Sequence, residues 1–271
     1  ILMKDFISFY KDENHVPRKD YYYGIIKRWL DTKGSSEEAQ AKDYYRRVCS
    51  DADTLTQTLR LDDPTDRKEG AVELMPFEIE KSDRHNNTFF IVSMALAVAR
   101  YNHARRSMIY WLYNTRNDSA SMGTVGAFAA PMPVYLTFAQ GDDTQALLAR
   151  ADEQIKVSMA HSDYSWLLED SGKDIVNMAR LNYRNNMDIA AHFKGFIDAS
   201  LPVPSVSTSA GVFSISVRDD SDKEKLRFGR RYSRSNLSSR SVETLSIYFK
   251  EAAELLDRND KEEIWRWLNH E

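Results

Sequence analysis

Residues 125–134 read VGAFAAPMPV, a short run in which a glycine and a phenylalanine precede apolar residues and prolines. Glycine lacks a Cβ and lets another part of the chain approach the backbone closely, whereas a phenylalanine ring is suited to filling a core. Just after this run, residues 134–138 predict a strand, and Thr144 predicts the cap of an amphipathic helix over residues 144–160. We therefore expect Gly126 and Phe128 to shape the fold.

Elsewhere in the chain, strand-like segments occur in runs mixed with long helical segments, without regular alternation of the two. This order indicates an α+β fold with a mixed or mainly antiparallel sheet covered by helices. A polar turn between the last two strands predicts a hairpin. The expected strands are 107–113, 134–138, 175–183, 212–217 and 226–232, and the expected helices are 88–101, 144–160 and 241–257, capped by Thr88, Thr144 and Ser241 or a neighbour. The expected core residues are Phe128, Leu148, Ile155, Phe213, Ile215, Leu245 and Phe249.

The N-terminal quarter is predicted to be helical. Residues 1–10 repeat apolar side chains at helical spacing, and a second helical stretch runs from Pro17 through Trp29. Residues 35–38 read SSEE, a capping-box signature that opens a third helix.

Composition excludes several classes of function. The formal net charge is −4, which argues against nucleic acid as a partner; we interpret Arg227, Arg230, Arg231 and Arg234 as the solvated face of a strand. The apolar run 88–99 is too short to cross a bilayer, so we expect no membrane contact. A single cysteine, Cys49, excludes an internal disulfide and fits a cytoplasmic location.

Two further stretches accompany the run at 125–134. Residues 161–166 read HSDYSW, and residues 182–186 read NYRNN. In this order the three stretches resemble the "IGxFxNTLPLR", "HQDYPFE" and "FNYQN" segments of nonribosomal peptide synthetase condensation domains, which have a chloramphenicol-acetyltransferase-like fold. By this resemblance, residues 1–66 are the helices after the HHxxxDG motif and the inter-lobe linker, and residues 67–271 are the C-terminal lobe.

The resemblance implies acyl transfer, in which an acceptor aminoacyl amine attacks a donor thioester to form a peptide bond. The family's catalytic histidine belongs to HHxxxDG, which does not occur in these 271 residues. None of the six histidines stands in that pattern or in a metal-binding HExxH pattern. We therefore expect no catalytic residue and no metal site in this chain, and no activity from the chain alone.

Site residues follow from the same resemblance. The candidates for the substrate tunnel are Asn182, Tyr183 and Asn185. The residues expected to be structural are Arg116, Gly126, Phe128, Pro133, His161, Asp163 and Tyr164, with Asp163 binding backbone and Tyr164 packing. The chain departs from the family where Ala130, Pro131 and Tyr135 replace polar residues.

The resemblance also implies partners. No cofactor would bind directly, because the substrates are carried on the phosphopantetheine arms of carrier proteins. The expected partners are peptidyl carrier protein domains, the missing N-terminal lobe and neighbouring synthetase domains. Three alternatives stay open: an epimerisation domain of the same fold, a non-catalytic lobe that docks carrier proteins as a scaffold, and a free-standing acyltransferase that uses coenzyme A.

Overall fold

The computed structural model describes residues 22–50, 59–62, 70–116, 118–122, 124–126, 128–171, 178–185, 212–219 and 224–270, together with Ser8, Lys11, Asp12, Asn14 and Val16. Its elements, in chain order, are α2 (Tyr22–Asp31), α3 (Ser36–Ser50), β1 (Gly70–Glu80), α5 (Asn87–Tyr101), β2 (Arg106–Asn114), α6 (Ser119–Met122), β3 (Ala129–Thr137), α7 (Thr144–Met159), the 3₁₀ helix η1 (Ser162–Ser171), β4 (Ala179–Asn185), β5 (Phe213–Asp219), β6 (Lys225–Ser233), α9 (Ser239–Arg258) and α10 (Lys261–Leu268).

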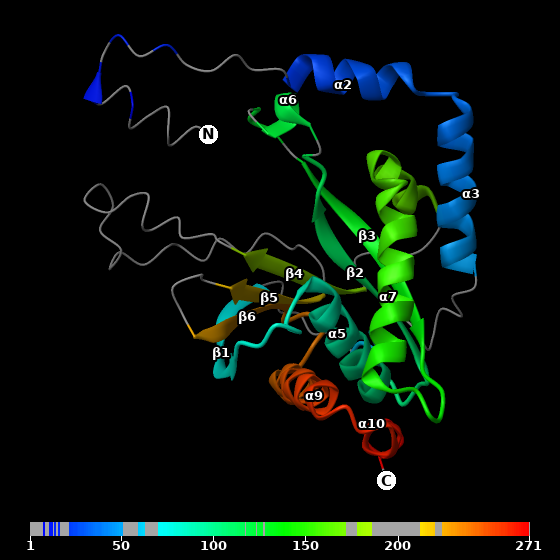
Figure 1. Ribbon diagram of the computed structural model, residues 1–271, viewed down its shortest axis with the longest axis vertical. Coiled ribbons are helices and arrows are strands. Elements are labelled where there is room, and N and C mark those ends of the chain that lie inside the picture. Colours follow the sequence, from blue (N-terminus) through cyan, green and yellow to red (C-terminus); the bar gives the residue numbers. More distant parts are fainter. Residues whose placement is uncertain are drawn as a thin grey trace.

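The described strands form one mixed sheet of six, in the order β1-β6-β5-β4-β2-β3 (Figure 1). The pairs β1/β6, β5/β6 and β2/β3 are antiparallel, and β2/β4 and β4/β5 are parallel. The expected α+β fold and the β5–β6 hairpin are thus confirmed. Parallel neighbours cannot be joined by a tight turn, which explains why β4 connects to β2 and β5 through long segments.

One face of the sheet, here called the helix face, packs against α5, α7 and α9. The helix α5 is buried from Phe89 to Ala99 and is apolar on all sides, as is typical of a helix at the centre of a core. On the opposite face, α3 and η1 cover the β2 side of the sheet with Tyr44, Tyr45 and Leu167 against Met108 and Tyr110. Among the described residues, no helix is long and apolar enough to span a membrane.

Helix starts differ from expectation by one or two residues. Asn86, not Thr88, caps α5 by accepting a hydrogen bond from the Phe89 N–H, and Asp143, not Thr144, caps α7. In both cases a residue with a better-placed side-chain oxygen precedes the predicted cap. Ser238, a neighbour of Ser241, caps α9. The predicted serine cap of α3 is confirmed, because Ser35 Oγ accepts from the Glu38 N–H at 3.1 Å, but the Glu38 carboxylate accepts from the Gly34 N–H and does not complete the box at Ser35.

Strand β1 was not predicted. Its Pro76 and alternating glutamates argue against a central strand, but β1 lies at the sheet edge, where proline is tolerated. Leu148 was also wrongly placed in the core: it is only partly buried, and Leu147 takes the inward position on α7. The other six predicted core residues are buried. Apart from Ser8, the expected helix over residues 1–10 lies outside the described residues.

Candidate functional site

Phe128 is the centre of the first motif region. Its buried ring meets the rings of Tyr22 and Trp29 on α2 edge-on, with centroids 5.9 and 6.3 Å away. The guanidinium of Arg116 lies 4.1 Å from the centroid of the Phe128 ring and donates hydrogen bonds to the carbonyls of Thr124 and Gly126. Arg116 thus clamps the loop that leads into β3 and holds it against α2.

Position 126 requires a glycine because the Tyr22 ring lies close to its backbone. A Cβ built on it would lie 2.2 Å from the Tyr22 ring, well inside van der Waals contact, so a larger residue would displace that ring. Pro133 lies in β3 opposite Tyr110 of β2. Because β3 is the other edge strand of the described sheet, its prolines interrupt no inner hydrogen-bond ladder.

The second motif region follows α7. The His161 ring stacks on Tyr44 of α3 with centroids 4.6 Å apart, and burial, with a smaller effect of Arg47, lowers the pKa of His161. The His161 carbonyl accepts from the Tyr45 hydroxyl at 3.0 Å. Tyr164 packs against the α3–η1 cluster. In contrast to expectation, no backbone group of the described residues binds the Asp163 carboxylate.

A pocket of about 210 Å³ separates α2 from this region. Arg28 and Asp118, which line it, form an ion pair at 3.4 Å. Asp163 also lines it, and partial desolvation raises the pKa of its carboxyl although Arg28 opposes the shift. The pocket is smaller than the usual range for ligand sites, about 300–1,000 Å³, and its arginine already has a partner. We therefore place the candidate site elsewhere.

The three tunnel candidates do not gather at one point. Side chains alternate along β4, so Tyr183 points to the helix face, where it stacks on Phe90 and donates to the Asp219 carboxylate at 2.8 Å. Burial, followed by this bond to Asp219, raises the pKa of the Tyr183 hydroxyl. Asn182 points to the opposite face. Asn185 ends β4, and its side chain lies outside the described part of the structure.

Asn182 lies among arginines. With its amide oxygen turned toward Arg184, it accepts from Nε and Nη2 of that residue at 3.1 Å. Five arginines of three adjacent strands lie on this side of the sheet. We call four of them the arginine face: Arg180 and Arg184 of β4, Arg218 of β5 and Arg231 of β6. The fifth, Arg227 of β6, lies between Arg218 of β5 and Glu78 of β1 in the register. In the strand register, Arg184 lies beside Arg218, while Ser214 lies between Arg180 and Arg231.

The arginine face is electrostatically unusual. Partial loss of solvent lowers the pKa of Arg184, and Arg218, Arg180 and Arg231 lower it further, in that order. Arg184, Arg218 and Arg231 form no ion pair with any carboxylate of the described residues. On β1, Glu78 lies opposite Arg227 and Glu80 lies opposite Lys225, with which it forms an ion pair. Guanidinium groups held together in this way favour an anion that neutralises them.

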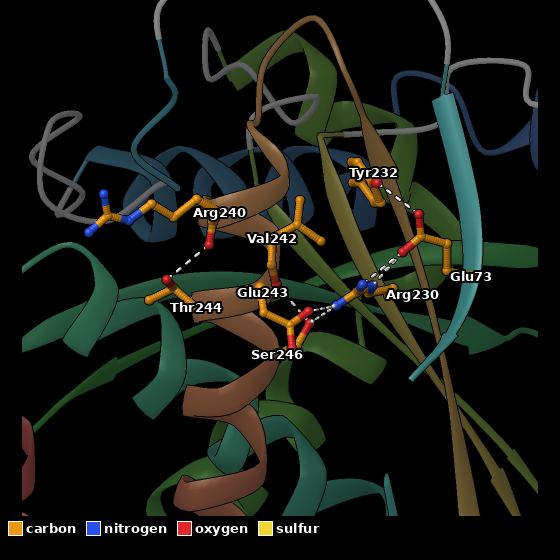
Figure 2. Close-up of polar contacts among 8 residues, drawn as sticks. All are labelled: Glu73, Arg230, Tyr232, Arg240, Val242, Glu243, Thr244 and Ser246. Carbon is orange, nitrogen blue, oxygen red and sulfur yellow. Dashed lines mark hydrogen bonds and ion pairs between the residues drawn. The ribbon is translucent and has the colours of Figure 1, made fainter. Parts of the chain in front are cut away.

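Arg230, the neighbour of Arg231, has the opposite environment (Figure 2). It donates from Nε and Nη2 to Glu73 of β1 at 2.9 and 2.8 Å, and from Nη1 to Glu243 and Ser246 of α9 at 2.8 and 2.9 Å. Tyr232 donates to the second oxygen of Glu73. The interpretation of Arg230 as a solvated residue was therefore wrong: its side chain is 13% exposed and joins β1, β6 and α9.

Sequence reasoning also missed a histidine–aspartate pair. His85 Nε2 lies 3.0 and 2.9 Å from the two carboxylate oxygens of Asp257, across α5 and α9. The His85 side chain is 2% exposed and packs against Phe89 and Phe90. A ring buried this deeply cannot reach a substrate, so the pair fastens α9 to the start of α5. No sequence signal could have identified it, because 172 residues separate the partners.

Comparisons with known proteins point to one fold. No family model and no curated protein matches the chain. Solved structures do match. The epimerization domain from the third module of tyrocidine synthetase B has a TM-score of 0.68 at 16% identity, with 93% of this chain and 63% of that chain covered. The starter condensation domain of rhizomide synthetase has a TM-score of 0.69 at 12% identity, with 93% and 59% covered. The chain has the condensation-domain fold.

A third structure of this fold, the condensation domain from monacolin K polyketide synthase, has a TM-score of 0.66 at 13% identity, with 90% of this chain and 62% of that chain covered. The chain therefore spans about three fifths of the length of these domains. At identities this low the likeness establishes the condensation-domain fold alone. Because an epimerization domain matches as well as condensation domains do, the fold does not choose between the two reactions.

Proposed function

We propose that these 271 residues form the C-terminal part of a condensation domain, which joins a donor acyl or peptidyl thioester to an acceptor aminoacyl thioester. The observation that carries the proposal is the placement of the three motif stretches. The first leads into β3, the second opens η1 and the third lies in β4, so all three lie on elements next to β2 or β3 in a fold shared with condensation domains. A chance likeness of short motifs would not be expected to cluster in this way.

In this proposal the chain positions substrate and does not supply the base. Attack of the acceptor amine on the thioester carbonyl creates a tetrahedral oxyanion, which collapses to the amide and releases the thiol of the donor arm. Hydrogen-bond donors that are already oriented stabilise such an oxyanion and hold an amide in place. Asn182 is the candidate for this role, because its amide is held by Arg184 on the face of β4 that the core does not occupy.

The test uses the full-length natural protein that contains this chain, with donor and acceptor carrier proteins loaded separately. Mass spectrometry of the acceptor carrier is expected to show the condensed product. Asn182→Ala should lower its rate of formation about tenfold while leaving the melting temperature unchanged, because a positioning group is lost and no core atom is. The control is Gln145→Ala, which removes an exposed amide from α7.

Other outcomes separate the alternatives. If the protein instead exchanges the α-hydrogen of a loaded aminoacyl carrier with deuterium from solvent and inverts it, without condensation, the domain is an epimerase. If loaded carriers bind but neither reaction occurs, the scaffold alternative holds. Turnover of acyl-coenzyme A in the absence of carrier proteins would favour a free-standing acyltransferase. Each of these results would contradict the proposed condensation.

A further inference from the structure

The arginine face has a regular geometry that the backbone fixes. Neighbouring strands of a sheet lie about 4.8 Å apart, and residues i and i+4 of one strand are about 13 Å apart. Arg184 and Arg218 are register partners on adjacent strands, so their backbones are direct neighbours. Arg180 and Arg231 lie on either side of Ser214, two strands apart. The four cations therefore surround an area on the order of 10 Å by 13 Å.

Short residues occupy the middle of this area. Ser216 lies between Asn182 of β4 and Gly229 of β6 in the register, and Ser214 lies one step along β5. Ser216 is half-buried and offers a hydroxyl donor, whereas Ser214 is buried, and neither side chain is long enough to reach past the surrounding guanidinium groups. The opposite sides of the same strands are filled by buried Leu181, Ile215 and Val217, so the sheet beneath is rigid and dry. Cations and hydroxyl donors thus converge over a fixed base.

The small area and the positive charge of the arginine face limit the classes of ligand that it can bind. The chain as a whole is acidic, with a net charge of −4, so the positive charge is local and does not extend as nucleic acid would need. All four arginines belong to adjacent strands, and Arg184, Arg218 and Arg231 pair with no carboxylate of the described residues. Planar guanidinium groups match the oxygen geometry of carboxylates and phosphates. A small ligand with at least two negative charges could contact several of them together.

We propose that the arginine face binds a small oxyanion ligand, a phosphate ester or a polycarboxylate, through Arg184, Arg218 and Arg231, with Ser216 as an additional donor. This inference goes beyond the proposed function and does not depend on it. The binding test below needs no turnover, so its failure would leave the condensation proposal untouched, and the reverse also holds.

The experiment is isothermal titration of the 271-residue chain with pyrophosphate, inorganic phosphate and citrate, each compared with sodium chloride at equal ionic strength. We expect saturable binding of pyrophosphate or citrate that chloride does not reproduce. Preference for pyrophosphate would identify a phosphate ligand, and preference for citrate a carboxylate ligand. Arg231→Gln and Arg184→Gln should each weaken the binding about tenfold, the loss of one charge-assisted contact. The double variant should weaken it further.

The matched control is Arg266→Gln, which removes the same charge from α10, where Arg266 pairs only with Glu262 of the same helix. It should leave the affinity unchanged, and circular dichroism should show all variants folded. The proposal would be overturned by heats that ionic strength alone reproduces, by equal weakening by Arg266→Gln, or by undiminished binding to the Arg184/Arg231 double variant. Self-association of the chain that persists at saturating anion and is abolished by Arg231→Gln would assign the face to a second copy and would also overturn it.

Discussion

Arg230 and Arg231 are neighbours in β6, yet the sheet places them in opposite electrostatic environments. Arg230 projects to the helix face, where Glu73, Glu243 and Ser246 take up its donors. Arg231 projects to the other side, where the groups that influence Arg184 are all arginines. The same residue type therefore has two roles. On the helix face an arginine binds acidic side chains and joins elements of the fold, whereas on the arginine face its charge is available to bind a ligand.

The sharpest test of the helix face is truncation of a core ring. Phe249 is fully buried and contacts the rings of Phe90 and Phe228, so Phe249→Ala should destabilise the protein by about 3–5 kcal/mol. Urea denaturation followed by circular dichroism measures the difference. Ile247→Ala on the same helix removes a side chain that is 45% exposed and should cost less than about 1 kcal/mol. Equal effects of the two changes would mean that α9 does not bury this side.

Exchange of each neighbouring arginine for glutamine tests the comparison directly. Arg230→Gln leaves Glu73 without its cation and should cost about 2 kcal/mol, in the range of a hydrogen bond to a charged group. Arg231→Gln breaks no ion pair with a described residue and should change the free energy of unfolding by less than about 0.5 kcal/mol. Denaturant melting at neutral pH is the measurement. A larger cost for Arg231→Gln would show that the arginine face is structural.

A smaller effect is expected in acid. Burial alone would raise the pKa of Glu73, but hydrogen bonds from Arg230 and Tyr232 outweigh it and hold the pKa below its usual value of 4.5. The stabilisation from Glu73 is therefore fully present above pH 4.5 and is lost as the pH falls through the lower folded-state pKa. Melting temperatures measured between neutral pH and this acidic range should converge for wild type and Glu73→Gln. A difference that stays constant with pH would contradict this assignment.

Periodicity predicted most of the helix face because its strands and helices carry strong apolar patterns. The hairpin of β5 and β6 and six of the seven named core residues were predicted in this way. Leu148 was misplaced because adjacent leucines at 147 and 148 make the phase of α7 ambiguous. Strand β1 was not predicted. Its partner β6 lies near the other end of the chain, and its own sequence alternates glutamates with apolar residues around a proline.

The site was less predictable for a physical reason. The resemblance named Asn182 and Tyr183 together, but strand alternation sends them to opposite faces, and only the register shows which arginines accompany Asn182. Arg180, Arg184, Arg218 and Arg231 are spread over 51 positions of sequence and become neighbours only when β4, β5 and β6 pair. The sequence analysis treated Arg230 and Arg231 alike, because the acids that neutralise Arg230 come from β1 and α9 and are distant in sequence.

Because β1 pairs with β6, it is synthesised long before its partner strand. Glu73 and Arg230 are 157 residues apart, so β1 leaves the ribosome long before its only partner in the described sheet has been translated. At typical elongation rates the interval is roughly 10–30 s. During that time β2, β3, α5 and α7 can already associate, because they are close in sequence. Until β6 has been synthesised, the backbone N–H and C=O groups of β1 have no strand partner. We expect chaperones to bind the nascent chain during this interval.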